Sequence, residues 1–134
     1  MASQPFDWYE YFKLAADLGK RTDEASLRSA ISRAYYYVYH LALDRAQANA
    51  YKPLPGEATH TQLWRLFETN PESDCKRLAM IATRMKQKRE RADYENHFVR
   101  IVEEVPVLLE DAQQFARLLA ALPMRHPNPK SMRR

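Results

Sequence analysis

Glycine is almost absent from this chain, and its scarcity restricts the possible folds more than any other feature of the sequence. Only Gly19 and Gly56 occur among 134 residues, while alanine, leucine, arginine, glutamate and lysine are abundant. Tight hairpin turns depend on residues that tolerate positive φ, whereas the abundant residues favour helices. We therefore expect an all-α protein, an up-and-down bundle of four to five helices with short connections.

Apolar residues recur at three- and four-residue intervals in five segments, which predict the helices of the bundle. Gly19 is placed to end the first, and Thr22 or Asp23 can cap the second. Pro106 lies inside the fifth pattern, where it either kinks the helix or marks its start. The expected helices cover approximately residues 7–18, 23–49, 59–70, from 71 or 73 into the basic segment 84–97, and 102–122.

The domain organisation follows from where these patterns stop. Residues 1–122 read as a single helical domain of a size that supports a modest core. Residues 123–134 hold three prolines and four basic residues with almost nothing to bury. We expect this basic, proline-rich tail to be disordered.

Composition also limits the classes of function. The lone Cys75 cannot form an intrachain disulfide, and no segment approaches the ~20 apolar residues that span a bilayer, so we expect a cytoplasmic protein without membrane insertion. Neither a glycine-rich phosphate loop nor metal-ligand spacing occurs, so no cofactor or metal is expected. The net charge of +4 favours anionic partners only modestly.

The fourth predicted helix places an arginine where its apolar stripe calls for a leucine. Continuing the inward rows puts Arg89 on the buried side of the helix, and Arg84, Lys88 and Arg91 toward the opposite side. The stripe that defines this direction consists of Leu78, Ile81, Ala82, Met85 and Ala92.

Three residues of this segment are candidates for catalysis. If the helix persists through residue 97, Arg89, Asp93 and His97 follow one another at i, i+4 and i+8 on one face. A guanidinium can clamp a phosphate, an imidazole can transfer protons near neutral pH, and a carboxylate can orient either group. The alternative is an intrahelical Arg–Asp ion pair with a histidine near a helix end.

A second cluster lies on the second predicted helix. Arg33 and Tyr37 form one i, i+4 pair, and Tyr36 and His40 form another. These residues can support the neighbouring site or stack on the bases of single-stranded RNA. The alternative is that the tyrosines form a core edge or a dimer interface. His60, at the start of the third predicted helix, is a weaker candidate.

Three pieces of sequence in a fixed order resemble the HEPN superfamily of small helical domains: the run Ser32-Arg-Ala-Tyr-Tyr, then His60, then an arginine-x-x-alanine-aspartate-tyrosine run that ends at Tyr94. The likeness spans roughly residues 24–120. It implies a helical bundle that dimerises. Many members are metal-independent ribonucleases, including toxins and antiviral effectors, so a toxin–antitoxin or phage-defence setting is the expectation.

The ribonuclease site of this superfamily combines an arginine with a later histidine, with four to six residues between them, and two alignments are open. Arg91 and His97 have that spacing. The alanine-aspartate-tyrosine version instead places Arg89 at the arginine position and Tyr94 at the histidine position, which departs from the catalytic pattern. The apolar stripe favours the second alignment. An unperturbed tyrosine, with a pKa of about 10, transfers protons poorly at neutral pH.

Three functions remain open on these grounds. The first is a ribonuclease in which Arg89 or Arg91 holds the scissile phosphate and His97 activates the ribose 2′-hydroxyl, with Arg33, Tyr37, His40, Arg84 and Lys88 supporting RNA binding. The second is a noncatalytic HEPN domain that binds RNA or a nucleotide. The third is a regulatory partner of a nucleotidyltransferase-like protein. A homodimer is expected in which two Arg89–Asp93–His97 rows face each other across a two-fold axis.

Overall fold

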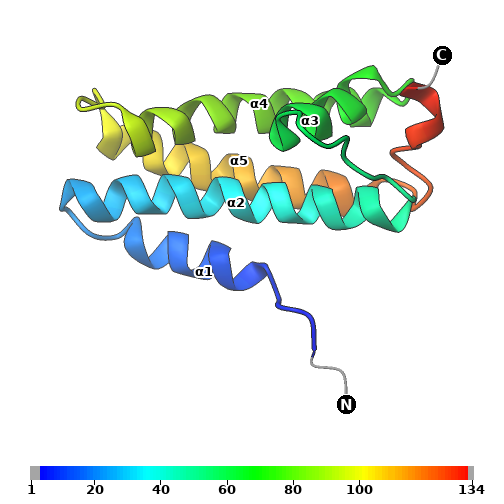
Figure 1. Cartoon of the computed structure of the whole chain (residues 1–134). Coiled ribbons are helices and arrows are strands. Elements are labelled where there is room, and N and C mark those ends of the chain that lie inside the picture. The colour runs from blue at the N-terminus through cyan, green and yellow to red at the C-terminus, as the bar shows by residue number, and fades with distance from the viewer. Residues whose placement is uncertain (1–3, 133–134) are drawn as a thin grey trace.

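The structure, a computed structural model, describes residues 4–132 and is all-helical over that range. No strand occurs among these residues, which confirms the predicted fold class. α1, α2, α4 and α5 alternate in direction, and the short α3 lies between α2 and α4 in the chain (Figure 1). The elements are α1 (Tyr9–Leu18), α2 (Glu24–Ala48), α3 (Thr59–Thr69), α4 (Ser73–Tyr94), α5 (Ile101–Ala121) and a 3-10 helix, η1 (Pro129–Met132).

Local chemistry explains where the first two helices meet. The Asp23 carboxylate accepts a hydrogen bond from the backbone N–H of Ser26 at 3.0 Å, so Asp23 is the N-cap of α2. Gly19 ends α1 and also allows a close approach to α5. A Cβ atom at this position would lie 3.0 Å from Cγ1 of Val105 and 3.3 Å from Cδ1 of Leu109.

α2 is the central helix of the bundle. It packs against α1, α4 and α5, and α3 packs mainly against α4. α1 lies on the side of α2 that faces away from α4 (Figure 1). The largest fully buried apolar side chains come from α2, α3, α4 and α5, so these four helices share one core: Tyr35, Ile31, Phe67, Leu63, Leu66, Leu78, Met85, Leu108 and Phe115.

The start of α5 differs in detail from the prediction. The helix begins at Ile101 and runs through Pro106, which therefore does not mark its start. Ile101 is buried, whereas Val102, which the apolar pattern placed on the inner side, is 64% exposed. Ile101 therefore continues the buried stripe of Val105, Leu108 and Ala112, and Val102 lies outside it.

The segment that follows α5 lies against the end of the bundle as far as η1, and the expected disorder of residues 123–134 stays a prediction. The segment is held by Arg45 of α2, whose buried guanidinium donates to the backbone oxygens of Leu119 (2.8 Å), Leu122 (3.2 Å), Pro123 (3.4 Å) and His126 (3.2 Å). These bonds pair the carbonyls that the end of α5 leaves free. Residues 133 and 134 of the predicted tail lie outside the described residues.

Across residues 4–132, no helix combines the length and the apolar character needed to cross a bilayer.

Candidate functional site

Arg89 is buried beneath the C-terminal half of α4, as the apolar stripe predicted. Only 7% of the residue is exposed. Its guanidinium carbon lies 5.3 Å from the ring centre of Tyr35 and 5.5 Å from that of Tyr36, both on α2. An aromatic face stabilises a guanidinium that has lost part of its hydration. The Arg89 guanidinium therefore packs on the aromatic residues of α2.

The guanidinium is only partly satisfied by other polar groups. Its Nη1 atom lies 3.6 Å from Oδ2 of Asp93, and the Asp93 carboxylate also accepts a hydrogen bond from Oγ of Ser32 at 3.3 Å. The Arg89 Nε atom is buried without a hydrogen-bond partner among the described residues. Arg89 also contributes to the lining of an open surface pocket, so a ligand from solvent can reach this residue.

His60 joins the same cluster through a chain of hydrogen bonds from α3 to α2. Nε1 of Trp64 donates to the Tyr35 hydroxyl at 3.0 Å, and that hydroxyl lies 2.6 Å from Nδ1 of His60. His60 Nδ1 is the only acceptor within reach of the Tyr35 hydroxyl among the described residues, so the hydroxyl donates to it. In a neutral imidazole the other nitrogen then carries the proton. His60 presents an Nε2–H donor.

The electrostatic surroundings keep His60 neutral. Burial, together with the positive charges of Arg89 and Lys86, lowers the pKa of His60 to about 4. Burial also raises the pKa of Tyr35 well above its usual value, so this phenol keeps its proton. At neutral pH the cluster is therefore a set of hydrogen-bond donors with one buried positive charge.

His60 and Arg89 of this cluster line an open pocket of about 390 Å³ between α3 and α4, named here the His60 pocket. Lys86 and Glu90 form an ion pair at 3.2 Å on its α4 side, and Tyr94 completes it. The Tyr94 residue is 77% exposed. The pocket thus combines cationic donors with an aromatic ring that is free to stack. Its lining residues are Ala58, Thr59, His60, Thr61, Lys86, Arg89, Glu90 and Tyr94.

The predicted row of three catalytic residues does not form. α4 ends at Tyr94, and His97 is an exposed residue of the segment that connects α4 to α5. The helix stops because Arg28 of α2 donates to the carbonyls of Ala92 (2.9 Å) and Glu95 (2.6 Å). The expected i, i+4, i+8 spacing is therefore wrong for His97, and only Arg89 and Asp93 share a helical face.

The remaining basic residues of α4 form ion pairs away from the His60 pocket. Arg84 binds the largely buried Asp111 carboxylate of α5, with Nη2 to Oδ1 at 2.9 Å, and Lys88 pairs with Glu104 of α5. Arg91 packs over the Phe98 ring at 4.3 Å and lies 3.7 Å from Glu95. The structure thus places Arg84 and Lys88, predicted to support RNA binding, at the α4–α5 contact.

The candidates Arg33, Tyr37 and His40 on α2 all contact the N-terminal segment or α1. Tyr37 is buried 5.5 Å from the Phe12 ring, and the His40 ring stacks on Trp8 at 3.4 Å, so both hold the N-terminal segment and α1 against α2. Burial lowers the pKa of His40. Arg33 is exposed and lies over the Tyr11 ring at 5.1 Å. Neither Tyr37 nor His40 contributes to the His60 pocket.

Sequence reasoning missed two contributors to the site. Lys86 lies three residues before Arg89, a spacing that puts both on one side of a helix, so it was recognisable in principle. Ser32 was read only as part of the aromatic run, and its contact with Asp93 joins helices that are 61 residues apart in sequence. His60 was considered as a weaker candidate, and its hydrogen bond to Tyr35 joins residues that are 25 apart in sequence.

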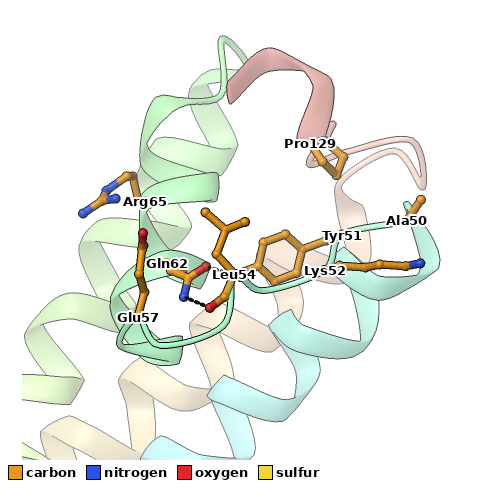
Figure 2. Close-up of a pocket in the computed structure, with 8 residues that line it drawn as sticks. All are labelled: Ala50, Tyr51, Lys52, Leu54, Glu57, Gln62, Arg65 and Pro129. Atoms are coloured by element: carbon orange, nitrogen blue, oxygen red, sulfur yellow. Dashed lines mark hydrogen bonds between the residues drawn. The ribbon is translucent and has the colours of Figure 1, made fainter. Parts of the chain in front are cut away.

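A second hollow of about 470 Å³ lies where the loop after α2 passes η1 (Figure 2). The Gln62 side chain accepts from the N–H of Leu54 at 2.7 Å and donates to its carbonyl at 3.1 Å, which holds the loop against α3. Lys52 and Arg65 point away from each other in Figure 2. The charged side chains that line this hollow, Lys52, Glu57 and Arg65, are all exposed, whereas the His60 pocket includes the buried Arg89.

Neither a metal site nor a similarity to known proteins indicates the function. Among residues 4–132, no three histidine, cysteine or acidic side chains are grouped so that they could hold a metal ion. No family model, curated protein or solved structure matches this chain. The site itself must therefore support any functional proposal.

Proposed function

We propose that this chain is a HEPN-type RNA-binding protein whose His60 pocket holds a phosphate of single-stranded RNA, with Tyr94 stacked on a neighbouring base. One observation carries the proposal. Three nitrogen donors, from His60, Lys86 and Arg89, and one exposed tyrosine line the same pocket. Phosphate oxygens accept from such donors, and bases of any identity stack on aromatic rings.

The chemistry of the pocket supports binding rather than cleavage. Removing the proton of a ribose 2′-hydroxyl requires a base, and the accessible nitrogen of His60 is the one that carries a proton. His97, the predicted base, lies beyond the end of α4. The donors remain suited to a phosphate that is held without reacting, which corresponds to the noncatalytic alternative among the three functions.

The test is binding of a labelled ten-nucleotide oligouridine, measured by fluorescence anisotropy at low salt. We expect Tyr94→Ala to weaken binding by about 1–3 kcal/mol, the usual contribution of one stacked base. Tyr94→Phe keeps the ring and should bind like the wild type. Because the Tyr94 side chain is exposed, both variants should unfold at the same denaturant concentration as the wild type.

Lys86→Gln tests the charge in the pocket and has a matched control. Lys86 pairs with Glu90 one turn away, and Lys13 on α1 pairs with Glu10 at 2.9 Å in the same manner. Lys13 belongs to the helix on the opposite side of α2 from α4 (Figure 1). Lys86→Gln should weaken binding and Lys13→Gln should not. Equal affinities for the two variants would refute the pocket, and no binding by the wild type would refute the function.

The same samples test cleavage. After incubation in EDTA we expect the oligouridine to remain intact. Products that end in a cyclic phosphate, formed by the wild type and lost in His97→Ala, would instead establish the ribonuclease function and show that His97 reaches the phosphate.

A further inference from the structure

A second open pocket includes Asp93 of α4, one turn after Arg89. It has a volume of about 350 Å³ and lies between the N-terminal half of α2 and the last turn of α4. Its polar lining comes from Ser29, Ser32, Arg33 and Asp93, with Arg28 at one end. We name it the Arg33 pocket.

Arg33 is the available cation of this pocket. No carboxylate of the described residues forms an ion pair with it, and its guanidinium lies 5.1 Å over the Tyr11 ring. The ring restrains the side chain without neutralising its charge. Arg28 differs, because it pairs with Glu24 at 2.9 Å and donates to the carbonyls at the end of α4. Arg33 is thus free to bind an anion.

Two hydroxyl groups accompany this guanidinium. Ser29, Ser32 and Arg33 are spaced at i, i+3 and i+4 on α2, so all three face one side of the helix. The Ser32 hydroxyl donates weakly to Asp93 at 3.3 Å, and Ser29 makes no side-chain hydrogen bond within residues 4–132. Serine hydroxyls and arginines are among the groups that contact phosphate oxygens in nucleic-acid complexes.

The two pockets are neighbours along α4. Arg89 lines the His60 pocket, Asp93 lines the Arg33 pocket, and the two side chains lie 3.6 Å apart. The Arg89–Asp93 pair is therefore the boundary between two adjacent donor pockets.

We infer that the Arg33 pocket is a second phosphate subsite, so that the ligand is an RNA strand with at least two consecutive phosphates crossing from the α3–α4 side to α2. The inference rests on the proposed function, and it excludes a mononucleotide as the full ligand. The Asp93 carboxylate lines the Arg33 pocket beside Arg89, where it can accept a hydrogen bond from a ribose hydroxyl between the two phosphates.

The experiment compares two probes across a salt series. One is a labelled uridine dinucleotide with a single phosphate, and the other is the ten-nucleotide oligouridine. For the longer probe, Arg33→Gln should reduce affinity and lower the slope of log affinity against log salt by about 0.7, the value for one phosphate contact on a single strand. For the dinucleotide, Arg33→Gln should bind like the wild type, whereas Lys86→Gln should bind more weakly.

Two further variants keep the result interpretable. Arg125→Gln removes an exposed arginine at the other end of the bundle and should change neither affinity nor slope. Ser29→Asp retains Arg33 but adds a negative charge to the pocket, and it should weaken binding of the longer probe only. Circular dichroism and denaturant unfolding should show a wild-type fold for each variant, since the altered side chains are exposed.

The outcomes distinguish a failure of the second phosphate subsite from a failure of the proposed RNA binding. If Lys86→Gln lowers the salt slope while Arg33→Gln and Ser29→Asp bind the longer probe like the wild type, the second subsite is refuted and the proposed function stands. If Arg33→Gln also weakens the dinucleotide, the pockets form one site and the inference fails. If no variant changes the binding of either probe, the proposed function itself fails.

Discussion

The Tyr35 hydroxyl donates a hydrogen bond to Nδ1 of His60 over 2.6 Å, and this contact determines the chemistry that the imidazole can perform. Because Trp64 already donates to the same hydroxyl, the Tyr35 proton is directed to His60. The imidazole is left with a proton on Nε2 and no basic nitrogen toward solvent. A histidine that could serve as a general base elsewhere is a hydrogen-bond donor here.

Tyr35→Phe should destabilise the protein and allow His60 to adopt both neutral tautomers. The substitution leaves the buried Trp64 N–H without its acceptor, which costs about 1–3 kcal/mol of unfolding free energy. Denaturant unfolding measures that loss. The ¹⁵N shifts of the imidazole should show the Nε2–H tautomer in the wild type and a mixture in the variant. A single unchanged tautomer in Tyr35→Phe would contradict the hydrogen-bond assignment.

His60 should make stability depend on pH in the mildly acidic range. Its pKa is about 4 in the folded protein, below the ordinary value of 6.5, mainly because the ring is buried. Between these two values the unfolded chain binds a proton that the folded protein does not. The free energy of unfolding should therefore fall as the pH is lowered from about 6.5 to about 4. Denaturant unfolding at several pH values measures this decrease.

The control for this pH dependence is His60→Gln, which retains His40 and its own lowered pKa. The variant should lose less stability than the wild type over the same pH interval. Parallel curves for the two proteins would show that His60 is not the group responsible.

Tyr51→Phe should raise stability, in contrast to the same chemical change at Tyr35. The Tyr51 hydroxyl is buried and has no hydrogen-bond partner among the described residues. Replacing an unsatisfied buried hydroxyl by hydrogen removes a desolvation cost of about 1 kcal/mol. Unfolding of both variants under identical conditions should give shifts of opposite sign. A loss of stability in Tyr51→Phe would reveal a partner for that hydroxyl.

Arg28→Met should loosen the last turn of α4. The guanidinium donates to three carbonyls at this end, those of Arg91 (3.4 Å), Ala92 (2.9 Å) and Glu95 (2.6 Å). Removing these bonds should cost about 1–3 kcal/mol and increase hydrogen exchange at residues 92–95. RNA binding should also weaken, because Tyr94 loses its fixed position.

Arg77→Met is the control for Arg28→Met, since Arg77 forms only an exposed pair with Asp74 at the other end of α4. Hydrogen exchange at residues 92–95 should not change in it. Equal exchange in the two variants would show that Arg28 does not hold the end of the helix.

The sequence predicted the helices well because their determinants are local. The apolar periodicity placed all five, and the Asp23 cap and Gly19 fixed the ends of two of them within about two residues. The burial of Arg89 was predictable for the same reason, since one stripe along a single helix decides it.

The features that sequence reasoning missed depend on contacts between helices. The end of α4 at Tyr94 is set by Arg28, more than 60 residues earlier, so no local pattern excluded a helix through His97. The pairing of Arg84 and Lys88 with α5 depends on how two helices face each other. A helical wheel shows which residues share a side of one helix, but it does not show which residues of a neighbouring helix they contact.

Because of the contacts of Arg45, the order in which the chain leaves the ribosome affects its folding. Its charge becomes buried when α2 packs, yet two of its four carbonyl partners belong to Pro123 and His126, after the last long helix. On the ribosome, a nascent chain that has emerged only as far as Leu119 could pack its helices but would bury a guanidinium with most of its acceptors missing. The bundle can therefore reach its full stability only once the segment after α5 has left the exit tunnel.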